Sequence, residues 1–210
     1  MSTNTIITIE RQYGSGGHLI GEKLAESLGI PFYDSELIKV AAKESGICEE
    51  IFESFDEKPT TSFLYSLVMD PYSLGYNSNS FDLPLNHKVF LAAFDTIKEL
   101  ASKGPCVFVG RCADYALSEY KDCFSVFVHA DIDWRINRLS QKHNKTAKEA
   151  KDMINKTDKS RSSYYNYYTN KKWGAASSYN LCVDSSKLGI DGAAKAIIQA
   201  IEIFDSIKNK

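Results

Sequence analysis

A cluster of glycines near the amino terminus is the part of the chain best suited to hold a phosphate group. Its members are Tyr13, Gly14, Ser15, Gly16, Gly17 and His18. They follow an apolar strand-like run and precede an amphipathic stretch. Glycines in such a turn let backbone N–H groups point inward, and the amino terminus of the helix adds partial positive charge. The loop therefore predicts an anion-binding cradle, with a merely tight strand-to-helix turn as the plainer alternative.

The loop departs from both common nucleotide-binding patterns. GxxxxGK[ST] would need glycine at Arg11, lysine at Gly17 and Ser or Thr at His18. GxGxxG fails as well, because Leu19 stands at the third glycine position. An altered phosphoryl-transfer site and the shell of one are both compatible with these letters.

Charged and polar residues also follow two further predicted strands. Asp34 and Ser35 come after "IPFY", and Arg111 comes after "PCVFVG". Ligands of parallel α/β sheets bind beyond the carboxyl ends of the strands, so these residues are candidates for ligand contact. Capping of the next helix by Asp34, and a salt bridge between Arg111 and Asp114, are the structural alternatives.

Basic residues gather in the segment 131–161. Arg135, Arg138 and Lys142 are spaced i, i+3 and i+7 and so share one helical face, and Arg161 follows on the next helix. Two basic helices near a phosphate cradle predict a lid that closes over phosphates, although a solvated charged surface is the commoner meaning. Tyrosines 164, 165, 167 and 168 with Trp173 either stack on bases or, as we favour, pack the lid onto the body.

Hydrophobic periodicity places these residues on alternating strands and helices. Strands are predicted at 6–9, 30–34, 105–110, 123–130 and 179–184, and helices at 17–28, 88–102, 111–118, 131–143, from 146 and at 191–207. Further helices are predicted between 37 and 70. This alternation, with strands apolar on both faces, indicates an α/β fold with a parallel sheet of about five strands wrapped by helices.

Composition and charge narrow the class further. The chain has 210 residues, 43% apolar and 25% charged, with a net charge of −2. No global field therefore draws it to nucleic acid or to an anionic membrane, and we expect neither partner. No apolar run reaches the length of a membrane span, no secretory leader is evident, and the five cysteines show no CxxC pair. We expect a cytoplasmic protein whose own side chains form no metal site, zinc included; the oligomeric state is left open.

Taken together, these motifs resemble the cytidylate kinase-like family, a branch of the P-loop nucleoside monophosphate kinases. The resemblance is carried by "ITIERQYGSGGHLIGEKLAESLGIPFYD", "VFVGRCADYAL", "DKSRSSYYNYYTNKKWG" and "YNLCVDSSKLGI". It implies that the glycine loop holds ATP, that Asp34 and Ser35 contact the acceptor, and that Arg111 grips the acceptor phosphate. It also implies that Arg135, Arg138 and Arg161 are lid arginines.

The resemblance implies a single three-layer P-loop kinase domain over residues 1–210. Its core would be 1–33, 87–134 and 171–210, with an acceptor-binding insertion near 34–86 and a lid near 135–170. We predict phosphoryl transfer from ATP, with Mg²⁺, to a nucleoside monophosphate or another small phosphorylated acceptor, and Arg11 standing in for the missing lysine. The alternatives are a non-catalytic nucleotide-binding module and a kinase of a non-nucleotide small molecule.

Overall fold

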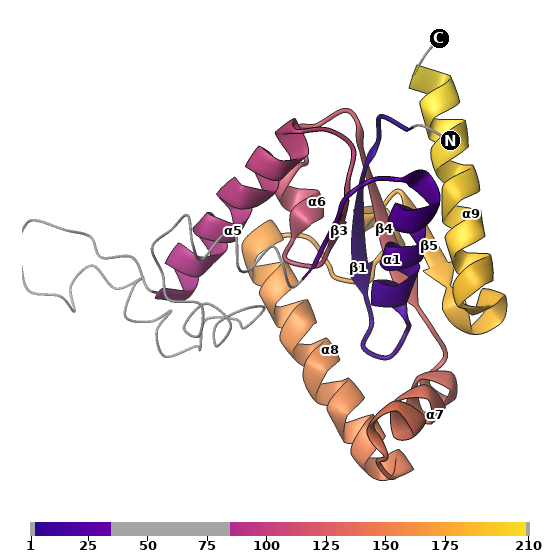
Figure 1. Cartoon of the computed structure of the whole chain (residues 1–210). Coiled ribbons are helices and arrows are strands. Elements are labelled where there is room, and N and C mark those ends of the chain that lie inside the picture. The colour runs from indigo at the N-terminus through magenta and orange to yellow at the C-terminus, as the bar shows by residue number, and fades with distance from the viewer. Residues whose placement is uncertain (1–2, 35–84, 209–210) are drawn as a thin grey trace, which may run out of the picture.

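The described part of the chain, residues 3–34 and 85–208 of a computed structural model, is centred on a parallel sheet (Figure 1). The strands are β1 (Ile6–Arg11), β2 (Phe32–Tyr33), β3 (Val107–Val109), β4 (Cys123–His129) and β5 (Leu181–Asp184). They lie in the order β2-β3-β1-β4-β5, and each neighbouring pair is parallel. The predicted α/β class with about five parallel strands is confirmed. Because β3 and β4 flank β1, the loops after these three strands meet at one edge.

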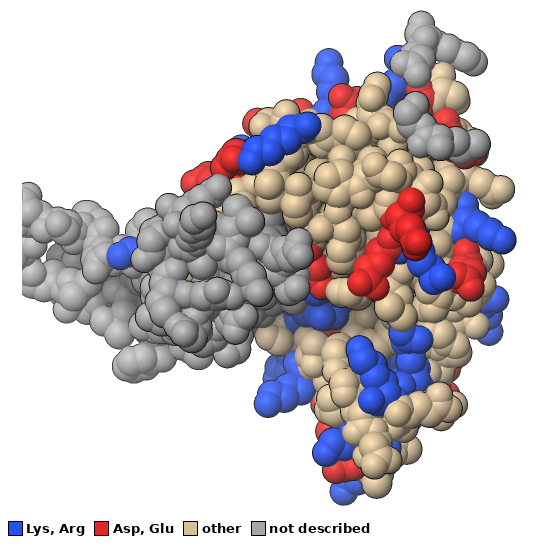
Figure 2. All heavy atoms as spheres, in the orientation of Figure 1, with Lys and Arg blue, Asp and Glu red and all other residues tan. Residues whose placement is uncertain are grey.

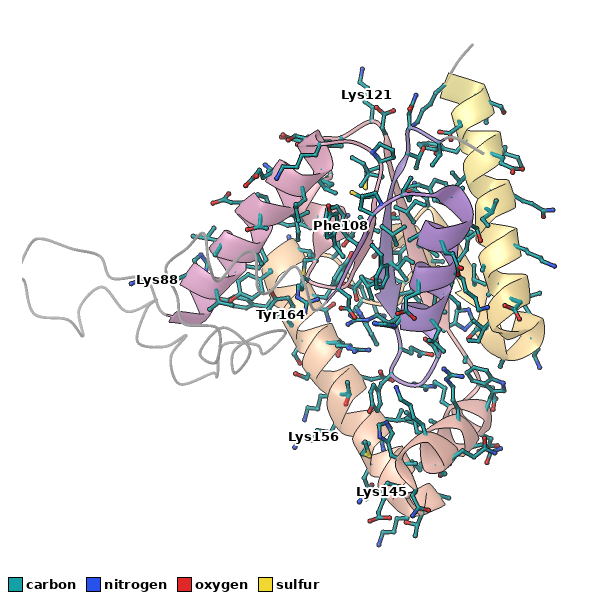
Figure 3. All side chains as sticks on the ribbon, in the orientation of Figure 1. Lys88, Phe108, Lys121, Lys145, Lys156 and Tyr164 are labelled. Atoms are coloured by element: carbon teal, nitrogen blue, oxygen red, sulfur yellow. The ribbon has the colours of Figure 1, made fainter. Side chains whose placement is uncertain are left out.

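Helices cover both faces of this sheet. One face carries α1 (Gly17–Leu28) and α9 (Ser185–Lys208), and the other carries α5 (Leu85–Ser102) and α6 (Ala113–Ala116). Ile7 and Ile9 of β1 pack with Ile197 of α9 in one core, while Phe108 packs with Ile97 of α5 in the other (Figure 3). All six residues of β1 are buried, because a strand between two helical layers has no solvent face.

Two helices differ from the sequence prediction. The segment predicted to be helical over 111–118 is helical only over α6, because Arg111 and Cys112 have φ values of 57° and 55°, which a right-handed helix does not accept. The last helix begins at Ser185 rather than near Asp191 and is interrupted at Gly189, whose φ of 68° only glycine adopts readily. The predicted elements between 35 and 84 lie outside the described residues.

The helices α7 (Ile132–His143) and α8 (Ala147–Thr169), which span most of the segment predicted to be a lid, extend beyond the carboxyl edge of the sheet (Figure 1). Asp131 caps α7 by accepting from the amide of Asp133 at 2.8 Å. Thr146 and Glu149 form a reciprocal capping box that begins α8. A short 3₁₀ turn, η1 (Ala176–Ser178), precedes β5.

Aromatic packing attaches the carboxyl end of α8 to the body. The ring of Tyr168 stacks on Phe90 of α5 at 3.9 Å between centroids, and Tyr164 points into the same contact (Figure 3). Tyr165 is fully buried. These contacts support the packing interpretation for Tyr164, Tyr165 and Tyr168, since rings held between helices are not available to stack on a base, whereas Tyr167 is exposed. None of the helices within 3–34 and 85–208 combines the length and apolar character that crossing a membrane requires.

Candidate active site

The glycine loop turns sharply between β1 and α1. Gly14 and Gly16 both have a φ of 83°, and Gly16 is the N-cap of α1. Ser15 between them is completely buried, and its carbonyl accepts a hydrogen bond from the hydroxyl of Ser185 at 2.6 Å. The same hydroxyl reaches the carbonyl of His129 at 3.1 Å. The beginning of α9 therefore braces the loop against the end of β4.

Most backbone amides of the loop donate no hydrogen bond within the described residues. The amide of Tyr13 donates to Asp158 at 2.7 Å, and the amide of Ser15 donates to the Gln12 carbonyl at 3.2 Å. Within the described residues, the other amides of the loop make no hydrogen bond. These amides belong to Gly14, Gly16, Gly17 and His18. They cluster at the amino terminus of a twelve-residue helix, the position where a bound anion gains both donors and dipole.

A cavity of about 240 Å³ lies in front of these amides. Its walls are most of the loop between Arg11 and Leu19, with Asp34 from the end of β2 and a basic group from the lid. The lid supplies Arg138 and Lys142 from α7 and Arg161 from α8. Figure 2 shows lysine and arginine side chains concentrated on the lid part of the molecule. The cavity thus combines backbone donors with guanidinium and ammonium groups, which suits a polyanion.

The side chain of Arg161 contacts the backbone of Arg11 where β1 enters the loop. The guanidinium of Arg161 donates to the carbonyl of Arg11 at 3.2 Å and lies 5.8 Å from the centre of the Tyr13 ring. These contacts attach α8 to the end of β1 and to the loop that follows it. The predicted lid arginine therefore lies at the loop in this structure.

Asp34 is held between two basic side chains. Its Oδ1 accepts from Arg111 at 3.1 Å, and its Oδ2 lies 3.0 Å from Nε2 of His18. Arg111 is 5% exposed, so this ion pair is largely screened from water. A salt bridge between Arg111 and Asp114 was the predicted structural alternative. Arg111 instead pairs with Asp34, because the parallel pairing of β2 with β3 brings the two strand ends together.

Arg135 lies behind the loop rather than in the cavity wall. Its guanidinium donates to Asp158 at 2.6 Å and to the Tyr13 carbonyl at 3.4 Å. Because Asp158 also accepts from the Tyr13 amide, one carboxylate fastens α7, α8 and the loop to each other. Sequence reasoning missed Asp158, although an acidic residue inside the basic stretch "NKTDKSR" was an available signal.

The absence of a side chain at residue 17 has a packing reason. A Cβ atom on Gly17 would lie 2.5 Å from Cβ of Arg11 and 3.1 Å from its Cγ. The Arg11 side chain thus occupies the space that a lysine at position 17 would need. Arg11 is itself buried and lines the cavity, so a cation is present at the loop, but it comes from the strand rather than the helix.

The remaining predictions concern Ser35, the acceptor-binding insertion and metal ligands. Ser35 and the expected acceptor-binding insertion lie outside the described residues. Across 3–34 and 85–208, no three or more His, Cys, Asp or Glu side chains come together as a metal site. A larger, open hollow of about 840 Å³ on the outer side of α1 is lined by apolar and acidic side chains with a single lysine, so it does not suit a phosphate.

Comparison with known proteins identifies the family of this chain and a crystal structure similar to it. The profile of the cytidylate kinase-like family matches residues 6–187. The crystal structure of an uncharacterized protein from Eubacterium ventriosum ATCC 27560 is 30% identical, with 94% of this chain and 98% of that chain covered and a TM-score of 0.71. A search of curated proteins finds no match.

Two more distant structures share the fold. Shikimate kinase from Bacteroides thetaiotaomicron is 15% identical, covers 94% of this chain and 98% of its own, and has a TM-score of 0.53. A gluconokinase from Sinorhizobium meliloti 1021 is 13% identical, covers 100% and 98%, and has a TM-score of 0.55. Both similarities concern the architecture of a P-loop kinase.

Proposed function

Since this chain belongs to the cytidylate kinase-like family, we propose that it transfers the γ-phosphoryl group of ATP to a nucleoside monophosphate. The observation that carries the proposal is the row of open amides at the start of α1, facing a cavity with three basic lid side chains. Phosphoryl transfer asks a protein mainly to position its reactants and to stabilise charge on the transferred group. Open amides and cations supply both.

The donor and its metal fit this site in a specific way. ATP would supply the phosphoryl group, and Mg²⁺ would neutralise part of the charge on its phosphates. The amides of Gly14, Gly16, Gly17 and His18 would hold the phosphates. Since the loop lacks the usual hydroxyl at position 18, the magnesium ligands would come largely from the nucleotide and water.

Arg11 takes the part of the missing loop lysine in this proposal. Its side chain fills the place that a residue at position 17 would use, and it lines the phosphate cavity. A guanidinium can donate two parallel hydrogen bonds to phosphate oxygens, where an ammonium acts as a point charge. The exchange therefore keeps the charge while changing the geometry of its contact.

The lid residues divide into two groups. Arg138, Lys142 and Arg161 line the cavity, and in the proposal they neutralise the charge that develops on the transferred group. Arg135 does not line the cavity; it holds the loop backbone in place, directly at the Tyr13 carbonyl and through Asp158. Closure of the lid over the cavity would exclude water and so limit hydrolysis of ATP.

Asp34 favours a second candidate, a kinase whose acceptor is the hydroxyl group of a small polar molecule. The carboxylate lines the same cavity as the loop, where it would repel an acceptor phosphate but could accept a hydroxyl proton. Its contacts with Arg111 and His18 would fix its orientation for that task. In the nucleotide reaction, Asp34 would instead orient the acceptor away from the transferred phosphate.

The experiment that tests the proposal measures ADP formation from ATP and Mg²⁺ with a panel of nucleoside monophosphates and a panel of small polyhydroxy acids. A nucleotide that raises ADP above the acceptor-free background supports the proposal, and a response restricted to the polyhydroxy acids supports the second candidate. If ATP raises the melting temperature but no acceptor yields ADP, the protein is a nucleotide-binding module and the proposal is wrong.

Arg11→Ala is the matched test of the site. Loss of one preorganised charge-stabilising donor commonly costs about 10²–10³ in kcat, and we expect a loss of that size. Lys156→Ala is the control, because Lys156 is an exposed lid cation that points away from the cavity (Figure 3). Equal activities of the Arg11 variant and the parent would refute the proposed role of Arg11.

A further inference from the structure

The two most exposed large apolar side chains of the described residues lie in adjacent turns of one helix. Ile203 and Ile207 of α9 are 62% and 65% exposed, whereas the other exposed side chains of this kind range from 39% to 49%. Single exposed apolar residues are common on soluble proteins, but neighbouring ones form a patch. Isoleucine is also a poorer helix former than leucine or lysine, so the helix itself gives no reason for it at these positions.

The two isoleucines continue a stripe of small residues along α9. Seen down the helix axis, at about 100° per residue, five residues share an arc of about 80°. They are Gly192, Ala196, Ala200, Ile203 and Ile207. Buried Ile197 and Ile201 lie about a third of a turn away, so the arc is a lateral face of the helix and not its core side. We call these five residues the α9 stripe.

The end of α9 that carries the isoleucines is tied to the body. Asp205 accepts hydrogen bonds from the hydroxyls of Thr3 at 2.6 Å and Thr5 at 2.5 Å. Lys208 pairs with Asp122 at 2.7 Å. These contacts fix the last two turns of the helix, so the isoleucines are presented on a preorganised surface and cost little ordering entropy on binding.

One exposed residue of each charge borders the α9 stripe on its solvent side. Lys195 and Glu202 are seven residues apart, which places them two turns apart on the same side of the helix. In an antiparallel pair of α9 helices with a twofold axis at residues 199–200, Lys195 of each copy lies within about 3 Å, measured along the axis, of Glu202 of the other. The charges beside the stripe are therefore complementary to those of a second copy.

The same twofold arrangement matches large residues with small ones. Ile203 of one copy faces Ala196 of the other, and Ile207 faces Gly192, because each pair of numbers is centred on the same point of the helix. A small residue opposite each isoleucine lets the two helices approach closely. An anionic membrane suits the stripe less well, since interfacial helices carry a face rich in lysine and arginine and this one is bordered by both signs.

We propose that the α9 stripe is a homodimer interface, in which two α9 helices pack antiparallel about a twofold axis. One helix a side is a small interface, so we expect a weak dimer with a Kd of about 1–100 µM. The stripe shares no residue with the cavity in front of the phosphate loop. The proposal therefore does not depend on the chemistry of that cavity.

Sedimentation equilibrium of the full chain tests this interface. The average mass should rise from 23.5 kDa towards twice that value as the protein concentration passes through the Kd. Ile203→Gln keeps a helix-forming side chain of similar length and should weaken the dimer about tenfold or more. Circular dichroism verifies that each variant is folded, and all the changed side chains are exposed.

Charge reversal tests the antiparallel register. Lys195→Glu and Glu202→Lys each place like charges opposite one another in their own homodimer, so each should weaken it about tenfold or more. A 1:1 mixture of the two variants restores both opposite-charge pairs, so its heterodimer should have a Kd within about threefold of the parent. Lys151→Glu makes the same change at an exposed position on α8 and should leave the Kd unchanged.

Three results would overturn the proposal. The first is a parent chain that stays monomeric up to about 0.5 mM, well above the expected Kd. The second is a dimer that Ile203→Gln or either charge variant leaves as strong as the parent, since the interface would then lie elsewhere. The third is a failure of the mixed charge variants to associate more tightly than each does alone, since the helices would then not be antiparallel in the proposed register.

Discussion

Replacing Gly17 with alanine tests whether Arg11 excludes a side chain from the phosphate loop. The new Cβ would lie 2.5 Å from Cβ of Arg11, whereas carbon atoms normally approach to about 3.5–4.0 Å. Neither atom is the end of a flexible side chain, so β1 or α1 must shift by about 1 Å. Overpacking of this kind costs about 1–3 kcal/mol in the free energy of unfolding.

Thermal and urea unfolding measure that cost directly. In a chain of this size, 1 kcal/mol corresponds to about 2–4 °C in Tm, so we expect Gly17→Ala to lower the Tm by about 2–12 °C. Gly192→Ala in α9 is the control, because its nearest contact would be 3.3 Å and its backbone is helical. There, Leu188 needs to shift by only a few tenths of an ångström, so alanine should change the free energy of unfolding by less than about 1 kcal/mol in either direction.

A double-mutant cycle identifies Arg11 as the cause. The partner change must be Arg11→Gly, since alanine would keep the obstructing Cβ. The cost of Gly17→Ala should shrink by about 0.5–3 kcal/mol in the Arg11→Gly background. An unaltered Tm for Gly17→Ala, or additive effects of the two changes, would refute the packing explanation. The double variant Gly17→Lys with Arg11→Gly moves the cation from β1 to the loop. If its kinase activity is higher than that of Arg11→Gly alone, a cation at position 17 can replace the one at position 11.

Three further outcomes are expected. Asp158→Asn leaves Arg135 without its charged partner, so urea unfolding should show a loss of about 1–3 kcal/mol, and a loss below about 0.5 kcal/mol would contradict its fastening role. Thr146→Ala removes an N-cap and should cost about 1 kcal/mol by the same measurement. Hydrogen bonds from Thr146 lower the pKa of Glu149 below its ordinary value of 4.5. The stability that these bonds contribute is therefore present at neutral pH and is lost as the pH falls through the pKa of Glu149 in the folded protein. The loss of unfolding free energy caused by Thr146→Ala should accordingly be smaller at pH 3 than at pH 7. Burial raises the pKa of Cys106 to about 12, so at pH 8 the thiol is protonated and does not react with iodoacetamide. Mass spectrometry should therefore find the Cys106 peptide labelled only after the protein is unfolded.

Local patterns in the sequence were enough to predict most elements and the loop itself. The α1 helix was predicted with its observed bounds, and Asp131 and Thr146 were identified at the starts of their helices. These features depend on residues within a few positions of one another, through caps, glycines and hydrophobic period. The same locality explains why the parallel sheet followed from the alternation of strands and helices.

The partners of the charged side chains required the tertiary structure. Arg111 and Asp34 are 77 positions apart and meet only because β2 pairs with β3. Asp158 reaches the amide of Tyr13 across 145 positions, because α8 returns beside the loop. The sequence alone determined that a glycine-rich loop precedes α1 and that helices cover both faces of a parallel sheet. Which cations surround that loop, and why position 17 carries no side chain, depended on the strand order, because contacts between distant segments leave no period in the chain.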